Sequence, residues 1–286
     1  MSPDFSIKKT ILYLKSELNG FYPLSEINSF IYLIFNHLFN YSKTDLFLKQ
    51  DTILPTNGIN EINHIVSELK KFKPIQYILG VTEFYNLNFK IHPGVLIPRP
   101  ETEELVQWVL SDHKDGSYRI LDIGSGSGCI SISLAKNLIG SKVFAADISE
   151  DALSLTRENS KLNNVDLQVI YLDILSNNDQ FEEKFDIIIS NPPYVTEKEK
   201  ELMHKNVLDF EPHKALFVPD NDPLLFYRNI AQFALTHLNK NGKIYFEINE
   251  QFGKDIAEML EKFEFHEIQI KKDINGKDRL IKCIMN

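Results

Sequence analysis

The chain has 286 residues, of which 43% are hydrophobic and 25% are charged, as in a folded globular protein with room for one large and one small domain. Its net charge of −9 argues against a broad basic face that follows bare nucleic acid, so we expect no direct contact with nucleic acid. Two cysteines without metal-ligand spacing, no signal pattern and no run of about 18 apolar residues predict no metal, no membrane association and a cytoplasmic location.

Residues 1–75 are predicted to form a small helical domain. Apolar residues recur at helical spacing from Ile11 to Leu18, and Gly20 is placed to end that helix. Further helices are predicted over 27–39, with a capping start at Ser25, and over 46–49 and 60–72. The pattern holds no catalytic constellation, so we expect this domain to dock a substrate protein or to cap the other domain.

Residues 76–98 are predicted to form a linker that contains a β-hairpin. Its strands are expected over 83–85 and 89–91, with a turn at 86–88. Beyond it, Arg99 lies between Pro98 and Pro100, which hold it extended before a helix over 101–111. Arg99 is either an exposed linker residue or, as we favour, a substrate-binding residue.

Residues 99–286 alternate between strands and helices, which predicts an α/β domain with a parallel sheet covered by helices on both faces. Helices are expected at 129–137, 152–162 and 251–262, among others, and a terminal hairpin around Asn275 and Gly276 would make the sheet mixed. The predicted strands are 119–123, 142–146, 167–171, 185–190, 243–248, 266–270 and 279–284.

The buried strand over 185–190 ends in a stiff turn, Asn191, Pro192, Pro193 and Tyr194. Ligands of open α/β sheets bind at the carboxyl ends of the strands. The Asn191 side-chain oxygen and the Pro192 carbonyl would be two fixed acceptors there, and Tyr194 a flat wall. This arrangement suits a planar group that carries an NH2. The alternative is a strand-ending turn without chemistry.

A glycine-rich loop, Gly-Ser-Gly-Ser-Gly at 124–128, follows Asp122 and opens a helix whose N-terminus offers free N–H groups. Its spacing is not the dinucleotide fingerprint. Asp122 can steady an ammonium group, Asp147 can accept both ribose hydroxyls, and Asp173 can meet an adenine amino group, unless it is only a surface acid. Together these features indicate S-adenosylmethionine.

The chain resembles the HemK/PrmC family of peptide chain release factor N5-glutamine methyltransferases over nearly its whole length. The resemblance rests on residues 74–80, on residues 94–103 with their Arg-Pro-Glu-Thr-Glu stretch, on the loop at 122–128 and on Asn-Pro-Pro-Tyr. Relatives often carry an aromatic residue at the place of Ile174 and glycine at the place of Asn249.

The resemblance implies a seven-stranded Rossmann-like methyltransferase fold and a protein substrate, the glutamine of the Gly-Gly-Gln motif in release factors 1 and 2. We expect a monomer with S-adenosyl-L-methionine as cofactor. Catalysis is assigned to Asn191, Pro192 and Tyr194, and substrate binding to these three with Pro193 and Arg99. Cofactor binding is assigned to Asp122, Ile123, Gly124, Ser125, Gly126, Asp147, Ile148, Asp173, Ile174 and Asn191.

Two other functions are compatible with these motifs. An adenine-N6 methyltransferase acting on DNA or RNA uses the same Asn-Pro-Pro-Tyr, but it needs a basic groove or a target-recognition domain. The net charge of −9 and the lack of a Lys/Arg-rich segment argue against this function. A non-catalytic partner protein could bind the cofactor and dock through the helical domain. The intact glycine loop, Asp147 and the tetrapeptide favour an enzyme.

Overall fold

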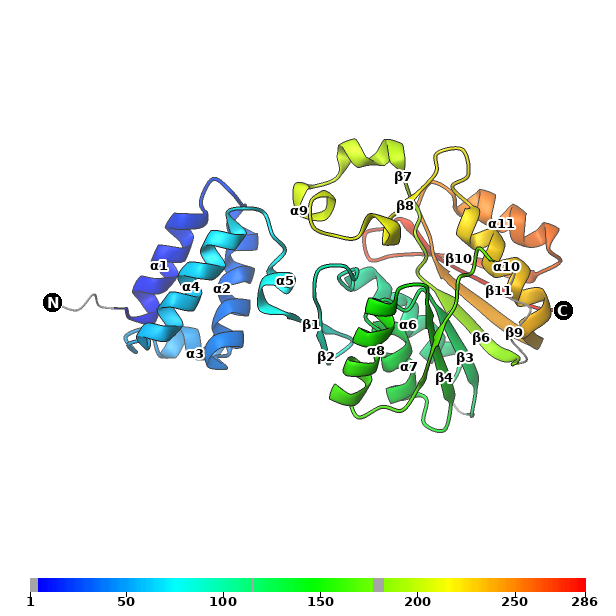
Figure 1. Cartoon of the computed structure of the whole chain (residues 1–286), viewed down its shortest axis with the longest axis horizontal. Helices are drawn as coiled ribbons and strands as arrows, with labels where there is room; N and C mark the ends of the chain where they lie inside the picture. Colours follow the sequence, from blue (N-terminus) through cyan, green and yellow to red (C-terminus); the bar gives the residue numbers. More distant parts are fainter. Residues whose placement is uncertain (1–4, 115, 177–182) are drawn as a thin grey trace. The chain divides into compact units, whose positions relative to one another are not determined.

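The computed structural model describes residues 5–114, 116–176 and 183–286. The chain divides into two compact units (Figure 1). The smaller unit runs to Gly80 and includes Lys205–Phe210, and the larger comprises Val81–His204 and Glu211–Asn286. No helix in the described ranges is long and apolar enough to cross a membrane.

The smaller unit is a helical bundle around an apolar core that includes Leu14, Phe35 and Ile62. It extends beyond the boundary expected at residue 75, because Ile78 and Leu79 also pack against this core. Its helices are α1 (Ile7–Leu18), α2 (Leu24–Phe39), α3 (Lys43–Leu48), α4 (Thr56–Leu69) and α5 (Ile75–Leu79).

The predicted capping start of the second helix is wrong. Helix α2 begins at Leu24, directly after Pro23, and no side chain caps it, so Ser25 lies inside the first turn. Pro23 has a φ of −67° and extended backbone, which suits the residue before a helix without help from a polar cap.

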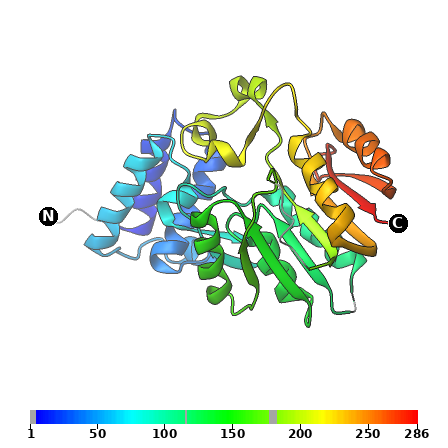
Figure 2. The ribbon, with the colours of Figure 1, turned by 45° about the vertical axis from the view of Figure 1, so that its right-hand side comes forward.

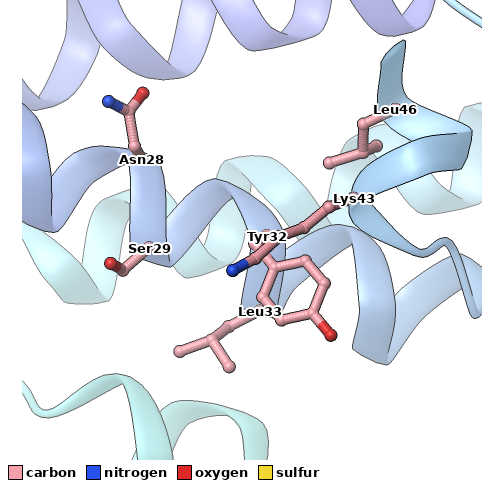
Figure 3. Close-up of a pocket in the computed structure, with 6 residues that line it drawn as sticks. All are labelled: Asn28, Ser29, Tyr32, Leu33, Lys43 and Leu46. Carbon is pink, nitrogen blue, oxygen red and sulfur yellow. The ribbon is translucent and has the colours of Figure 1, made fainter. Parts of the chain in front are cut away.

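A pocket of about 440 Å³ lies on the bundle, between α2 and α3 (Figure 3). The ammonium group of Lys43 lies 5.0 Å from the centre of the Tyr32 ring. The pocket is lined by Asn28, Ser29, Tyr32, Leu33, Lys43 and Leu46. This pocket contains none of the residues assigned to catalysis.

The predicted hairpin is present as β1 (Val81–Phe84) and β2 (Leu87–Lys90), but its turn is Tyr85–Asn86 rather than 86–88. Both turn residues have a positive φ, 48° and 59°, as a two-residue hairpin turn requires. The buried Asn159 side chain accepts a hydrogen bond from the Lys90 backbone N–H (2.7 Å) and donates one to the Lys90 carbonyl (3.1 Å). The hairpin is thereby fixed to helix α8 (Glu150–Leu162).

The larger unit contains a seven-stranded sheet in the order β10-β11-β9-β6-β3-β4-β5 (Figures 1 and 2). Strands β9, β6, β3, β4 and β5 run parallel, whereas β11 pairs antiparallel with both β9 and β10, which confirms the mixed sheet. The strands are β3 (Arg119–Ile123), β4 (Lys142–Asp147), β5 (Gln168–Tyr171), β6 (Phe185–Ser190), β9 (Leu238–Glu247), β10 (His266–Lys272) and β11 (Asp278–Ile284).

Two apolar layers cover the faces of this sheet, as the alternation of strands and helices predicted. On one face, α6 (Pro100–Asp112) and α7 (Cys129–Asn137) pack against residues such as Ile187 and Ile189 of β6. On the other, α10 (Leu225–His237) and α11 (Gly253–Lys262) pack against residues such as Ile188. Helix α8 (Glu150–Leu162) contacts β2, β4 and β5.

The segment between β6 and α10 contains short strands and helices that the sequence did not predict. Strand β7 (Val195–Thr196) pairs in parallel with β8 (Phe217–Val218). Between them lie a 3-10 helix (Glu197–Leu202), helix α9 (Lys205–Leu208) and a second 3-10 helix (His213–Ala215). These elements are too short to show a sequence period.

Candidate active site

The glycine loop and the Asn-Pro-Pro-Tyr turn lie at the same edge of the sheet, where parallel strands end. The backbone N–H groups of Gly124 and Ser125 donate to the carbonyl of Ala146 at the end of β4 (2.8 and 3.0 Å). The hydroxyl of Ser190 at the end of β6 donates to the carbonyl of Ile123 at the end of β3 (2.6 Å). These bonds hold the ends of three neighbouring strands together.

Two glycines of the loop are required for two different steric reasons. Gly124 is exposed with a φ of +77°, and apart from its own chain neighbours no described residue has an atom within 4 Å of the place a Cβ would take. Gly128 has a φ of +79°, and a Cβ there would lie 2.9 Å from Cγ2 of Thr156. Gly124 therefore leaves the backbone open to a ligand, and Gly128 allows helix α8 to pack closely.

Asp147 and Asp173 end neighbouring strands of this edge. Both Asp147 carboxylate oxygens accept backbone N–H groups, from Gly126 and Ser149, at 2.9 Å. Burial raises the pKa of Asp147, whereas these hydrogen bonds lower it. The Asp173 carboxylate accepts from the Leu175 N–H (3.0 Å) and the Ser176 hydroxyl (2.7 Å). Backbone groups thus orient both acids.

The apolar residues assigned to the cofactor differ in their exposure. Ile148 is 54% exposed at the end of β4, so its side chain is open to a ligand. Ile174 is half-buried and packs against the core of the sheet. Ile123 is buried within that core, which leaves only its backbone for contact with a ligand.

Asp122 lies beneath the glycine loop and is fully buried. One carboxylate oxygen accepts from the Ser131 N–H (3.1 Å), and the other has no hydrogen-bond partner in the described part of the chain. Burial raises the pKa of Asp122 to about 7, opposed by the hydrogen bonding from Ser131. The buried hydroxyl of Ser125 also has no partner among the described residues. These unpaired polar atoms fit a site for a polar ligand.

Asn191 belongs to a network of side chains at the end of β6. Its Nδ2 donates to Oγ1 of Thr102 (3.1 Å), and the Thr102 hydroxyl donates to Oε2 of Glu247 (2.6 Å). The Tyr194 hydroxyl donates to Oε1 of the same carboxylate (3.0 Å). Burial raises the pKa of Glu247, whereas the hydrogen bonds from Thr102 and Tyr194 lower it.

This network leaves two acceptors of the turn unpaired. Within the described ranges, no residue donates to Oδ1 of Asn191 or to the carbonyl of Pro192. Asn191 is half-buried, so its side chain is within reach of solvent or substrate. The turn is held in place from behind, because the N–H groups of Tyr194 and Val195 donate to the carbonyl of Leu216 (3.2 and 2.9 Å).

Asn249, which stands where relatives often carry glycine, braces the same turn. Its buried side chain donates to the carbonyl of Tyr194 (3.2 Å) and to the carboxylate of Glu199 (3.1 Å to each oxygen). Its Oδ1 accepts from the Gln251 N–H (3.0 Å). The departure from glycine therefore adds contacts between the turn and the 3-10 helix Glu197–Leu202.

Arg99 forms an ion pair with the buried carboxylate of Glu211, with Nη2 and Oε1 2.6 Å apart. The other Glu211 oxygen accepts from the Ile97 N–H (3.3 Å). Arg99 thus joins the start of α6 to the segment after α9. A third of its side chain, 32%, stays exposed.

Sequence reasoning did not identify Thr102, Glu247 or Glu211 as site residues. Thr102 was inside the Arg-Pro-Glu-Thr-Glu stretch, but helical spacing gives it no particular role. A usable signal for Glu247 was present: it is an acid inside the apolar run 244–248 of a central strand, and buried acids are rare without partners. Glu211, in an irregular segment, gave no such signal.

A mostly parallel seven-stranded sheet with a glycine loop at the carboxyl end of β3 defines the class as a Rossmann-like methyltransferase. Residues 101–210 match the family model described as methyltransferase small domain, and residues 22–80 match the PrmC N-terminal domain. A methyltransferase structure from Pyrococcus furiosus, 19% identical, covers 80% of this chain and 98% of its own with a TM-score of 0.52. At this identity the likeness concerns the fold alone.

The particular family follows from the curated relatives. A release factor glutamine methyltransferase of Flavobacterium psychrophilum is 49% identical over 90% of this chain and 91% of its own length. One of Bacteroides thetaiotaomicron is 46% identical over 94% and 96%. The chain belongs to the release factor glutamine methyltransferase family. It is a methyltransferase whose methyl donor is S-adenosyl-L-methionine.

Proposed function

We propose that this protein methylates the side-chain amide nitrogen of the glutamine in the Gly-Gly-Gln motif of peptide chain release factors 1 and 2. It acts as a monomer in the cytoplasm and without direct contact with nucleic acid. The observation that carries the proposal is a pair of acceptors in one turn, Oδ1 of Asn191 and the carbonyl of Pro192, to which no described residue donates. A primary amide offers two N–H groups that match them.

An amide nitrogen is a poor nucleophile because its lone pair is delocalised into the carbonyl. Holding both N–H groups aims the lone pair along one line, and such orientation contributes up to about 7–11 kcal/mol in ideal cases. The two acceptors also stabilise the positive charge that grows on nitrogen as the new bond forms. Pro193 keeps the turn stiff, and Tyr194 lies against the amide plane.

The methyl donor supplies an electrophilic carbon on a sulfonium centre. The chain's part is to position that carbon: Gly124, Ser125 and Gly126 offer backbone to the amino-acid end of the donor, with Asp122 beneath them. Asp147 would accept the ribose hydroxyls beside Ile148. Asp173 and Ile174 would receive the adenine. The backbone of Ile123 and the side chain of Asn191 would complete the donor site.

No strong base is needed in this mechanism, because the product nitrogen loses its proton readily to water or a carbonyl oxygen. Tyr194 does not serve as the base, since its proton is held toward Glu247 and burial raises its pKa. Arg99, which stays 32% exposed while it is paired with Glu211, is proposed to bind the substrate from the loop before α6.

The test mixes purified protein, isotope-labelled S-adenosyl-L-methionine and purified release factor 1 or 2. We expect mass spectrometry to find one labelled methyl group on the Gly-Gly-Gln glutamine. A release factor with alanine in place of that glutamine is the matched control and should stay unlabelled. Transfer to adenine in DNA or RNA, with an unlabelled release factor, would contradict the proposal and favour an adenine-N6 methyltransferase.

A further inference from the structure

An asparagine side chain can present either of its ends to a substrate. The proposed function needs the oxygen of Asn191 toward the substrate, because an amide NH2 group is a donor. Turning the Asn191 side chain by 180° about its last bond would present an NH2 group instead, and two donors would face each other. Something in the protein must therefore fix the orientation.

The contacts of Thr102 determine which orientation is stable. A hydroxyl has one proton, and the Thr102 hydroxyl donates it to Oε2 of Glu247 at 2.6 Å. Toward Asn191 the Thr102 oxygen can therefore only accept, and at 3.1 Å it accepts from Nδ2. A turned Asn191 would bring two acceptor oxygens together without a proton between them.

The carboxylate of Glu247 is in turn held on both sides. Its Oε1 accepts from the Tyr194 hydroxyl at 3.0 Å, and the residue is only 1% exposed. Thr102 is 2% exposed, so water does not replace either contact. The ionised carboxylate of Glu247 can only accept, and the hydrogen bonds from Thr102 and Tyr194 stabilise this form against burial. It therefore sets the direction of both hydrogen bonds, and with them the direction of the bond from Asn191 to Thr102.

We infer that Thr102 and Glu247 are positioning residues, which fix the Asn191 amide with its oxygen toward the substrate glutamine. The inference rests on the proposed function. Neither residue touches the reacting atoms. The buried Thr102 hydroxyl donates its proton to Glu247 and so keeps the Asn191 oxygen toward the substrate, where it favours an NH2 group.

The first test compares Thr102→Val with Thr102→Ser. Valine has nearly the shape of threonine but no oxygen, so we expect kcat to fall on the order of 10²-fold with KM for the release factor and Kd for S-adenosyl-L-methionine little changed. Serine keeps the hydroxyl and should restore kcat. Thr10→Val, at a buried threonine of α1, is the matched control and should keep the wild-type kcat.

The second test reverses the direction of the proton. In Glu247→Gln, the oxygen of the new glutamine can accept from Tyr194 only when the glutamine NH2 group donates to Thr102. The Thr102 hydroxyl then donates to the oxygen of Asn191. Asn191 therefore presents its NH2 group to the substrate, so kcat falls. Adding Asn191→Asp restores an oxygen on both sides. We expect the double variant to exceed Glu247→Gln by about tenfold or more in kcat.

If Glu247 served stability alone, the double variant should have a lower kcat than either single variant. Full activity of Thr102→Val, or a double variant no faster than Glu247→Gln, overturns the inference while the proposed function stands. A wild-type protein that leaves the release-factor glutamine unlabelled overturns the proposed function instead. Thermal unfolding of every variant identifies a loss of kcat that comes from a loss of fold.

Discussion

The two halves of the site are built from different parts of the chain. On the glycine-loop side, backbone N–H groups hold the acids: Gly126 and Ser149 hold Asp147, and Ser131 holds Asp122. On the Asn-Pro-Pro-Tyr side, side chains from α6, β9 and the turn hold one another. The first half is fixed by the fold, so a substitution there removes only the contacts of the substituted residue. The second depends on each member of a network, so a substitution there disturbs the others.

The largest effect is expected at Asn191. Asn191→Ala removes one of the two acceptors for the substrate amide, so turnover should fall on the order of 10³-fold or more. Affinity for S-adenosyl-L-methionine should stay within a few-fold, because the other nine residues assigned to the cofactor remain. Single-turnover kinetics and calorimetric titration measure the two quantities.

Asn137→Ala is the matched control for this variant, because among the described residues the exposed Asn137 side chain forms a hydrogen bond only to Ser133 of the same helix, α7. It should change neither turnover nor cofactor affinity. Normal turnover in Asn191→Ala would end the proposed mechanism.

At Asp147 we expect the opposite result: a loss of cofactor affinity with little loss of turnover. Asp147→Ala removes the carboxylate proposed to accept the ribose hydroxyls, so Kd for S-adenosyl-L-methionine should rise on the order of 10–100-fold. At saturating cofactor, turnover should stay close to that of the wild-type protein. Cofactor titrations at constant release factor check this, and a fall in turnover alone would remove the contrast between the two halves.

Asp122 should affect stability in a pH-dependent way. Its pKa is raised from 3.8 to about 7, so between these values the folded protein keeps a proton that the unfolded chain has released. The free energy of unfolding should therefore fall as pH rises from about 4 to about 7, by on the order of 2–4 kcal/mol from this group. Asp122→Asn should remove this part of the pH dependence.

Urea unfolding of both proteins without cofactor, at pH 5 and pH 8, measures the difference. Asp122→Asn should gain stability relative to the wild-type protein at pH 8 and little at pH 5. An equal difference at both pH values would contradict a raised pKa. The substitution should still weaken cofactor binding, since Asp122 lies beneath the glycine loop.

The smallest effect is expected at Asn249. Asn249→Gly removes its hydrogen bonds to the Tyr194 carbonyl and to Glu199, so the unfolding free energy should fall by about 1–2 kcal/mol. Turnover should fall only a few-fold, because Leu216 still holds the turn. Thermal unfolding and steady-state rates measure both, and an unchanged stability would show that this brace is dispensable.

Much of this protein follows from its sequence. Apolar periodicity gave the strands β3 and β6 at their observed bounds, because a buried parallel strand is a short apolar run between turn residues. The glycine loop and the two prolines after Asn191 restrict the backbone locally, so their places at the sheet edge could be predicted. The hairpin turn was displaced because Tyr85 accepts a positive φ that its residue type rarely adopts.

Only the tertiary structure decided how the Asn191 amide is oriented. Thr102 and Asn191 are 89 residues apart, and Thr102 and Glu247 are 145 apart, so no local pattern connects them. Their contact arises because the first turn of α6 lies beside Glu247 at the end of β9 and Asn191 after β6. The sequence determines which groups can donate and accept protons, but the direction of each hydrogen bond depends on which of them the fold brings together in a dry interior.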